Sequence, residues 1–104
     1  MKQNQFRFQN LEIWQHVATL SPKFFSTGDH LDNRCLFRFA EQLRGAVLSI
    51  TNNIAEGSGS ISRIDFANYL NIARRSTFEV ANILLLLGNN GYIAGRAWNL
   101  PFQN

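Results

Sequence analysis

The chain has 104 residues, of which 45% are hydrophobic and only 16% are charged, so its length suits one folded domain and excludes a large multidomain enzyme. So low a share of charge argues against intrinsic disorder and indicates that some apolar surface meets a partner. Eight arginines and two lysines outnumber seven acidic residues and give a net charge of +3. That charge permits an anionic partner without requiring one, and arginine is the basic residue best suited to phosphate or carboxylate contacts.

The cellular compartment follows from three further observations. Cys35 is the only cysteine, so an intrachain disulfide is excluded, and we expect a buried small hydrophobic side chain rather than a nucleophile. The first ten residues lack the apolar segment of a signal peptide. The longest uninterrupted apolar run, 83–87, is too short to cross a bilayer. We therefore expect a cytoplasmic protein without a membrane segment.

Apolar residues recur at helical spacing along most of the chain and predict three helices. The first, over about 10–25, carries apolar residues on one side. The second, over about 31–56, and the third, over about 63–87, have apolar residues at alternating steps of three and four. No sustained alternation of period two predicts a strand, so we expect an all-α fold in a single domain, 1–104. The positions that define the three buried faces are 11, 14, 17, 18 and 25; 36, 39, 43, 47, 50 and 54; and 66, 70, 73, 77, 80, 84 and 87.

Both long helices carry apolar residues outside these faces, and helices that are apolar on more than one side need more than one neighbour. Clusters of this kind favour association between chains, although apolar residues scattered singly over a surface are normal. The residues concerned are Phe37, Leu48 and Ala55 on the second helix and Ile72, Phe78, Ile83, Leu85 and Leu86 on the third.

The glycine-punctuated stretch 50–62, "ITNNIAEGSGSIS", separates the second and third helices. Gly57 and Gly59 stand where a left-handed residue commonly ends a helix, and Ser62 with Asp65 resembles an N-cap with its acidic partner. A phosphate-binding loop would need a preceding strand and a following Lys-Ser or Lys-Thr pair, and both are missing. We therefore expect a turn between helices.

Glu56 ends the second helix, where the helix dipole disfavours a negative charge. We expect its carboxylate to accept hydrogen bonds from the first amides of the next helix or to pair with Arg63. A structural role is favoured over a catalytic one, because no base or nucleophile lies nearby in the sequence.

Three segments resemble the small bacterial four-helix bundle proteins first named for members encoded in intervening sequences of 23S ribosomal RNA genes. They are "FQNLEIWQHVATL" at 8–20, "QLRGAVLSITNNIAEG" at 42–57 and "DFANYLNIARRSTFEVANILLLLGNNGYI" at 65–93, and the turn from Asn53 to Gly57 is the most specific. The resemblance implies an antiparallel up-down bundle with a long central hairpin, often a homopentamer. It also implies kinship with accessory subunits of reverse transcriptases from diversity-generating retroelements, which present a basic surface to nucleic acid and the enzyme.

The chain departs from the family pattern at three places. Thr51 replaces a usual proline, Gly45 replaces a usual basic residue after Arg44, and only eleven residues follow Ile93, with Pro101 among them. We therefore expect the fourth helix to be truncated to a short stub at 94–100, which leaves part of the core line of the other helices without its usual cover.

Few residues suggest catalysis or metal binding. Asp29, His30 and Asp32 lie close together in the segment 27–35, but three possible ligands in one loop do not form a metal cage, and helix N-capping by Asp29 or Asp32 is favoured. His16 is expected to be a surface or half-buried histidine. No Ser-His-Asp, Cys-His or paired-carboxylate spacing is present, so we expect no enzymatic activity, no metal and no cofactor.

The arginines support the leading hypothesis on function. On helical wheels Arg34, Arg38 and Arg75 lie opposite the core and Arg44 and Arg74 lie on flanks, interleaved with asparagines, so they could contact phosphates and bases. The alternative is a solvated face, although repetition of the +3 charge around an oligomer would strengthen its field. We therefore predict a non-enzymatic oligomeric adaptor that binds RNA, DNA or a reverse transcriptase through a basic face. A protein-interaction scaffold without a nucleic-acid role is the alternative.

Overall fold

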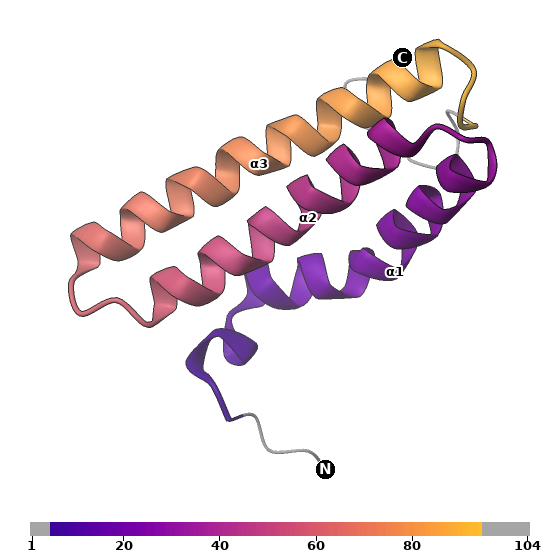
Figure 1. Ribbon diagram of the computed structural model, residues 1–104. Helices are drawn as coiled ribbons and strands as arrows, with labels where there is room; N and C mark the ends of the chain where they lie inside the picture. Colours follow the sequence, from indigo (N-terminus) through magenta and orange to yellow (C-terminus); the bar gives the residue numbers. More distant parts are fainter. Residues whose placement is uncertain (1–4, 95–104) are drawn as a thin grey trace.

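Three α-helices and a short 3₁₀-helix make up the part of the chain that the computed structural model describes, residues 5–94 (Figure 1). The 3₁₀-helix η1 spans Arg7–Asn10, and the helices α1, α2 and α3 span Glu12–Asn33, Phe37–Ser58 and Arg63–Asn89. No strand occurs between residues 5 and 94, which confirms the predicted all-helical class. Helix α2 lies between the other two helices and packs against both (Figure 1).

Helix α1 is longer than the predicted 10–25, because it continues through Pro22 to Asn33. Proline has no N–H, so the carbonyl of Ala18, four residues earlier, loses its usual helical donor. The hydroxyl of Ser21 donates a hydrogen bond of 2.8 Å to this carbonyl and so satisfies it. The predicted loop at 27–35 is therefore wrong over most of its length, since residues 27–33 form the last turns of α1.

The connection between α1 and α2 is a tight Schellman turn built around Cys35. The amide of Leu36 donates to the carbonyl of Leu31, and that of Cys35 to the carbonyl of Asp32. Cys35 adopts the left-handed conformation, with φ 60°, which is unfavourable for a residue with a Cβ. Its side chain is exposed, so the expectation of a buried cysteine is wrong. This turn also makes α2 begin at Phe37 rather than at the predicted 31.

The connection between α2 and α3 differs from the prediction in the role of its glycines. Gly57 lies inside α2, and Gly59 caps it with φ −86°, so neither provides the expected left-handed residue. Gly57 instead permits close packing, since a Cβ there would lie 2.6 Å from Cβ of Tyr69. The hydroxyl of Ser62 accepts a hydrogen bond of 3.1 Å from the amide of Asp65, which confirms Ser62 as the N-cap of α3.

The core lies along α2, where it faces α1 and α3. Most positions of the two predicted long stripes are buried, but Phe39 and Thr77 are exposed, whereas Ile83, predicted to lie on an outer flank, is buried. The stripe spacing did not identify Phe24 and Leu31 of α1, which complete the core from the first helix. Exposed apolar side chains remain outside the predicted buried stripes, as predicted, among them Phe37, Leu48, Ile72, Phe78 and Leu86.

Helix α3 ends in a second Schellman turn, in which Gly91 is left-handed with φ 76° and the amide of Tyr92 donates to the carbonyl of Leu87. The predicted third helix, 63–87, therefore extends by two residues. The predicted stub at 94–100 lies outside the described residues except for Ala94. Among residues 5–94, no helix has both the length and the hydropathy needed to cross a membrane.

Candidate functional site

An apolar groove lies between α1 and α3. No Cα of α1 lies within 8 Å of a Cα of α3, so both helices pack on α2 while their own backbones stay apart. Two hollows of ≈ 470 and 240 Å³ lie between α1 and α3, and a third of ≈ 360 Å³, lined by α3 residues alone, adjoins them; Thr77 lines all three. We call this surface the α1–α3 groove.

Each helix contributes a different part of the α1–α3 groove. Helix α1 provides one wall, with Ile13, His16, Val17, Leu20, Lys23 and Phe24. Helix α2 provides the floor at one end, with Ile50 and Ile54. Helix α3 provides the other wall, which includes Leu70, Arg74, Thr77, Phe78, Ala81 and Leu85. Between Leu70 and Leu85 the groove runs for roughly 22 Å at 1.5 Å per residue, which is the length of about four helical turns.

Arg44, predicted to contact nucleic acid, is held by carboxylates of α1. Its guanidinium lies 2.7 Å from Oδ1 of Asp29 and 2.8 Å from Oδ2 of Asp32. The hydrogen bond to Asp32, then that to Asp29 and the charge of both, raise the pKa of Arg44 against a partial desolvation that lowers it. A Cβ on Gly28 would lie 2.8 Å from Nε of Arg44, so this glycine makes room for the side chain. Asp29 and Asp32 are therefore ion-pair partners, and their predicted role as N-caps is wrong.

Arg34 is used within the fold, where it links the end of α1 to the segment after α3. Its Nη1 donates a hydrogen bond of 3.1 Å to the carbonyl of Tyr92, and its guanidinium lies 5.6 Å from the centre of the Tyr92 ring. Nε2 of His30 lies 3.3 Å from the same carbonyl, and the Phe39 ring packs against the Tyr92 ring. This cluster holds the segment after α3 against the end of α1 and the start of α2.

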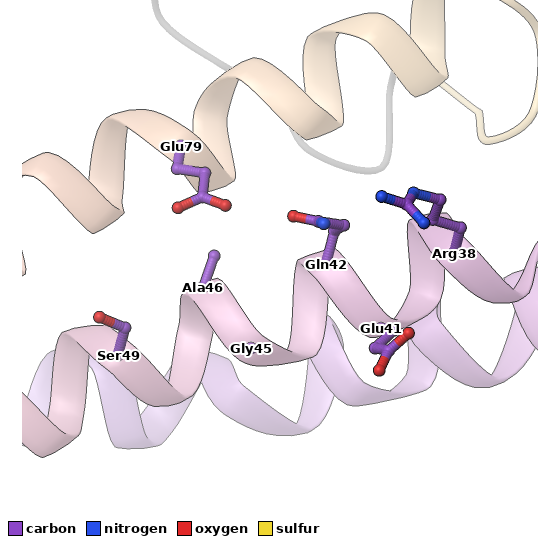
Figure 2. Close-up of a pocket in the computed structure, with 7 residues that line it drawn as sticks. All are labelled: Arg38, Glu41, Gln42, Gly45, Ala46, Ser49 and Glu79. Carbon is purple, nitrogen blue, oxygen red and sulfur yellow. The ribbon is translucent and has the colours of Figure 1, made fainter.

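Arg38 lies in a polar cleft between α2 and α3 (Figure 2). This cleft shares no lining residue with the α1–α3 groove. The cleft has a volume of ≈ 340 Å³, and Glu41 and Glu79 line it together with Arg38. Figure 2 shows Glu79 projecting from α3 toward α2, and Arg38 and Gln42 projecting into the same space. The two carboxylates oppose the binding of a phosphate at Arg38.

Arg74 and Arg75 are adjacent on α3 and point to different surroundings. Arg74 lines the α1–α3 groove, with its guanidinium 5.4 Å from the centre of the Phe78 ring. Arg75 is exposed, lines none of the hollows described above and forms no ion pair within residues 5–94. The five predicted arginines therefore lie in five different surroundings and do not form one basic patch within the described residues. Arg44 pairs with carboxylates of α1, Arg34 contacts Tyr92, Arg38 lies in the polar cleft, Arg74 lines the α1–α3 groove, and Arg75 is exposed.

Of the predicted turn residues, Asn53 takes part in a hydrogen-bond network, whereas Glu56 does not make its expected contacts among residues 5–94. Asn53 donates hydrogen bonds to the carbonyl and hydroxyl of Ser49, and that hydroxyl lies 2.7 Å from the hydroxyl of Ser76 on α3. This small polar network joins α2 to α3, and the sequence reasoning missed both serines. The carboxylate of Glu56 is exposed and makes neither expected contact, with Arg63 or with the first amides of α3, within the described residues.

Arg7 is a further residue that the sequence reasoning missed. Its Nη1 donates a hydrogen bond of 3.2 Å to the carbonyl of Ser58, at the end of α2, and its guanidinium lies 5.4 Å from the centre of the Phe66 ring. The carbonyls of the last helical turn have no intrahelical donor and carry partial negative charge, so a cation there is favourable. Arg7 thus anchors the N-terminal segment to the corner between α2 and α3.

The described residues contain no group of three or more His, Cys, Asp or Glu side chains that could hold a metal ion. His30 lies beside Asp29 in sequence, but its ring nitrogen faces the Tyr92 carbonyl, whereas Asp29 faces Arg44. His16 lines the α1–α3 groove among mainly apolar side chains. The α1–α3 groove therefore offers mainly apolar contacts.

The fold and the groove together define a small all-helical protein with an apolar surface open along one side. The chain belongs to the 23S rRNA-intervening sequence protein family, whose pattern it matches over residues 9–99, and the predicted membership is confirmed. Among curated proteins and among solved structures, none matches the chain.

Proposed function

We propose that this protein is a non-enzymatic helical adaptor that completes an antiparallel four-helix bundle by accepting a helix from a binding partner. The α1–α3 groove is the observation that carries this proposal. Directly packed helix axes lie roughly 8–10 Å apart. Helices α1 and α3 have no Cα atoms within 8 Å of each other although both pack on α2, so a groove remains between them. The apolar walls would be buried by an amphipathic helix laid along the groove, a common mode of peptide recognition.

The wall residues suit this role energetically. Phe78 is 65% exposed and Ile13 and Leu20 are each about half exposed, and all three lie on the two facing walls. Burying an apolar side chain of this size contributes roughly 1.5–3 kcal/mol when the burial is complete. Because these side chains are already partly buried, covering a few of them would give a moderate affinity for the partner helix, and binding would be reversible.

A substitution at the centre of the groove tests the proposal. Thr77 lies in all three hollows and is exposed, so Thr77→Glu places a charge in the groove without disturbing the core. The probe is a synthetic amphipathic helix of roughly 18 residues with leucines on one face and glutamines elsewhere, followed by fluorescence anisotropy. We expect the native chain to bind it, Thr77→Glu to bind it at least tenfold more weakly, and the control Asn71→Glu to bind it normally. No binding by the native chain would refute the proposed function.

Self-association is a second part of the proposal, supported by exposed apolar side chains that lie outside the groove. Phe37 and Leu48 are exposed on α2, and Ile72 and Leu86 are exposed on α3. The resemblance described above implies a homo-oligomer, often a pentamer. Light scattering on the full chain measures its molar mass, and a monomer at high protein concentration would contradict this part.

Nucleic-acid binding is the second candidate function, and the same resemblance extends it to a reverse transcriptase as partner. Its support is the net charge of +3 together with Arg75, which is exposed and forms no ion pair within the described residues. Arg38 is also exposed and forms no such ion pair, but Glu41 and Glu79 in the same cleft make it the weaker candidate. Titration with structured RNA, single-stranded DNA and duplex DNA at several salt concentrations tests it. Binding that weakens steeply with salt is expected from phosphate contacts, and Arg38→Glu with Arg75→Glu should abolish it. Absence of binding at low salt would exclude this candidate.

A further inference from the structure

The charged residues of the α1–α3 groove have one sign. Lys23 on the α1 wall and Arg74 on the α3 wall are cationic, and His16 on the α1 wall adds imidazole nitrogens. No carboxylate is among the described residues that line the three hollows. The acidic residue nearest to Arg74 along α3 toward the C-terminus, Glu79, lines the polar cleft on the other side of the helix.

The two walls place these nitrogen groups on both edges of the groove. His16 and Lys23 are seven residues apart and so lie on the same side of α1, two turns from each other. Arg74 faces them from the opposite wall. Its guanidinium lies over the Phe78 ring and forms no hydrogen bond or ion pair with another described residue, so its in-plane N–H donors are available to a carboxylate.

We propose that the groove selects an acidic amphipathic helix, in which Asp or Glu residues flank the apolar stripe, and that a different protein supplies this helix. The proposal rests on the proposed function and adds the chemistry of the partner. Leucines of the incoming helix would cover the floor and walls, and its flanking carboxylates would meet Arg74 on one edge. On the other edge, the positive charge of Lys23 and the imidazole of His16 favour acidic residues over basic ones. Complementary charge of this kind sets which partner binds and how fast it associates.

A second copy of this chain is a poorer match for the same groove. Each copy carries a net charge of +3, and the groove edges are themselves basic. Long-range repulsion between like charges therefore opposes self-docking at this site, whereas it favours an acidic partner. The self-association proposed above uses the other exposed apolar faces.

Three peptides separate the partner's charge from its apolar stripe. They share one leucine face and roughly 18 residues, and they carry glutamate, glutamine or lysine at the flanking positions. At low salt we expect the glutamate peptide to bind the full chain at least roughly tenfold more tightly than the lysine peptide, with the glutamine peptide between them. High salt should reduce the difference because the groove edges are exposed to solvent.

A matched pair of neighbouring arginines locates the effect. Arg74→Glu should weaken binding of the glutamate peptide several-fold and strengthen binding of the lysine peptide. Arg75→Glu makes the same change in net charge outside the groove and should leave both affinities close to those of the native chain. Equal binding of all three peptides, or equal effects of the two substitutions, would overturn the acidic-helix proposal while leaving the proposed function intact. No binding of any peptide would remove both.

Two further outcomes identify other occupants. If the native chain is a dimer in solution and Thr77→Glu is a monomer, a second copy occupies the groove and the proposal is wrong. If replacing Trp98 and Leu100 by serine in the full chain raises the affinity for the glutamate peptide tenfold or more, the chain's own C-terminal residues compete for the groove, which would also overturn it.

Discussion

Gly57 offers the sharpest test of how α2 and α3 pack. A Cβ at this position would lie 2.6 Å from Cβ of Tyr69 and 2.9 Å from Cδ1 of Phe66, whereas unbonded carbon atoms prefer about 3.5–4.0 Å. Because Cβ of Tyr69 is fixed to the backbone, no rotation of a side chain can relieve the contact. In Gly57→Ala the two helices must separate by roughly 1 Å at this point, and overpacking of this kind costs about 1–3 kcal/mol.

Gly45 is the matched control on the same helix. A Cβ there would meet no atom within 4 Å, and Gly45 is exposed in the middle of α2. Gly45→Ala should therefore stabilise the protein by about 0.5–1 kcal/mol, through helix propensity alone. The two alanine variants should differ by roughly 1.5–4 kcal/mol in the free energy of unfolding, which follows from the two estimates just given.

Urea denaturation followed by far-UV circular dichroism measures this difference, with equal slopes showing that the unfolding transition is comparable. For a protein of this size the difference corresponds to roughly 6 °C or more in Tm. If Gly57→Ala proves as stable as Gly45→Ala, the close approach of α2 to Tyr69 is wrong.

Three further substitutions test local features of the fold. Ser62→Ala removes the N-cap of α3 and should lower the free energy of unfolding by about 1 kcal/mol in the same urea assay; an unchanged midpoint would contradict the cap. Cys35→Gly removes the strain of a left-handed residue with a Cβ, about 1–2 kcal/mol, and adds an entropy cost of about 0.5–1 kcal/mol. We therefore expect a small rise in Tm. A fall in Tm would contradict the left-handed conformation of Cys35. Asp32→Asn should lower Tm more than Asp29→Asn, because Asp32 is the less exposed of the two partners of Arg44. High salt should reduce the difference in Tm between the two variants. A larger loss of Tm in Asp29→Asn would contradict the geometry of the ion pairs.

The helical pattern of the chain carries most of the information about its fold class. Steps of three and four along α2 and α3 predicted both helices, and the Ser62 cap followed from a local pairing with Asp65. The boundary between α1 and α2 could not be predicted in this way. It depends on the hydroxyl of Ser21 compensating for Pro22, and on Cys35 adopting a conformation that its residue type does not favour.

The candidate site was less accessible from the sequence. A helical wheel places Arg44 on a flank of its own helix. Its ion pairs with Asp29 and Asp32 depend on how α1 packs against α2, which the wheel does not show. Arg38 looked suited to phosphate until the packing of α3 placed Glu79 beside the same cleft. The uncovered core line was expected from the family pattern, whereas the basic edges of the α1–α3 groove appear only when α1 and α3 face each other.

The central claim is that the α1–α3 groove is the binding surface for a helix. Methyl NMR of the isotope-labelled full chain during titration with the glutamate peptide tests it most directly. If the helix binds in the groove, the methyl signals of Val17, Leu70 and Leu85, which line it, should shift together and saturate as peptide is added. Shifts confined to Leu48 and Ile72, on the outer faces, would contradict it.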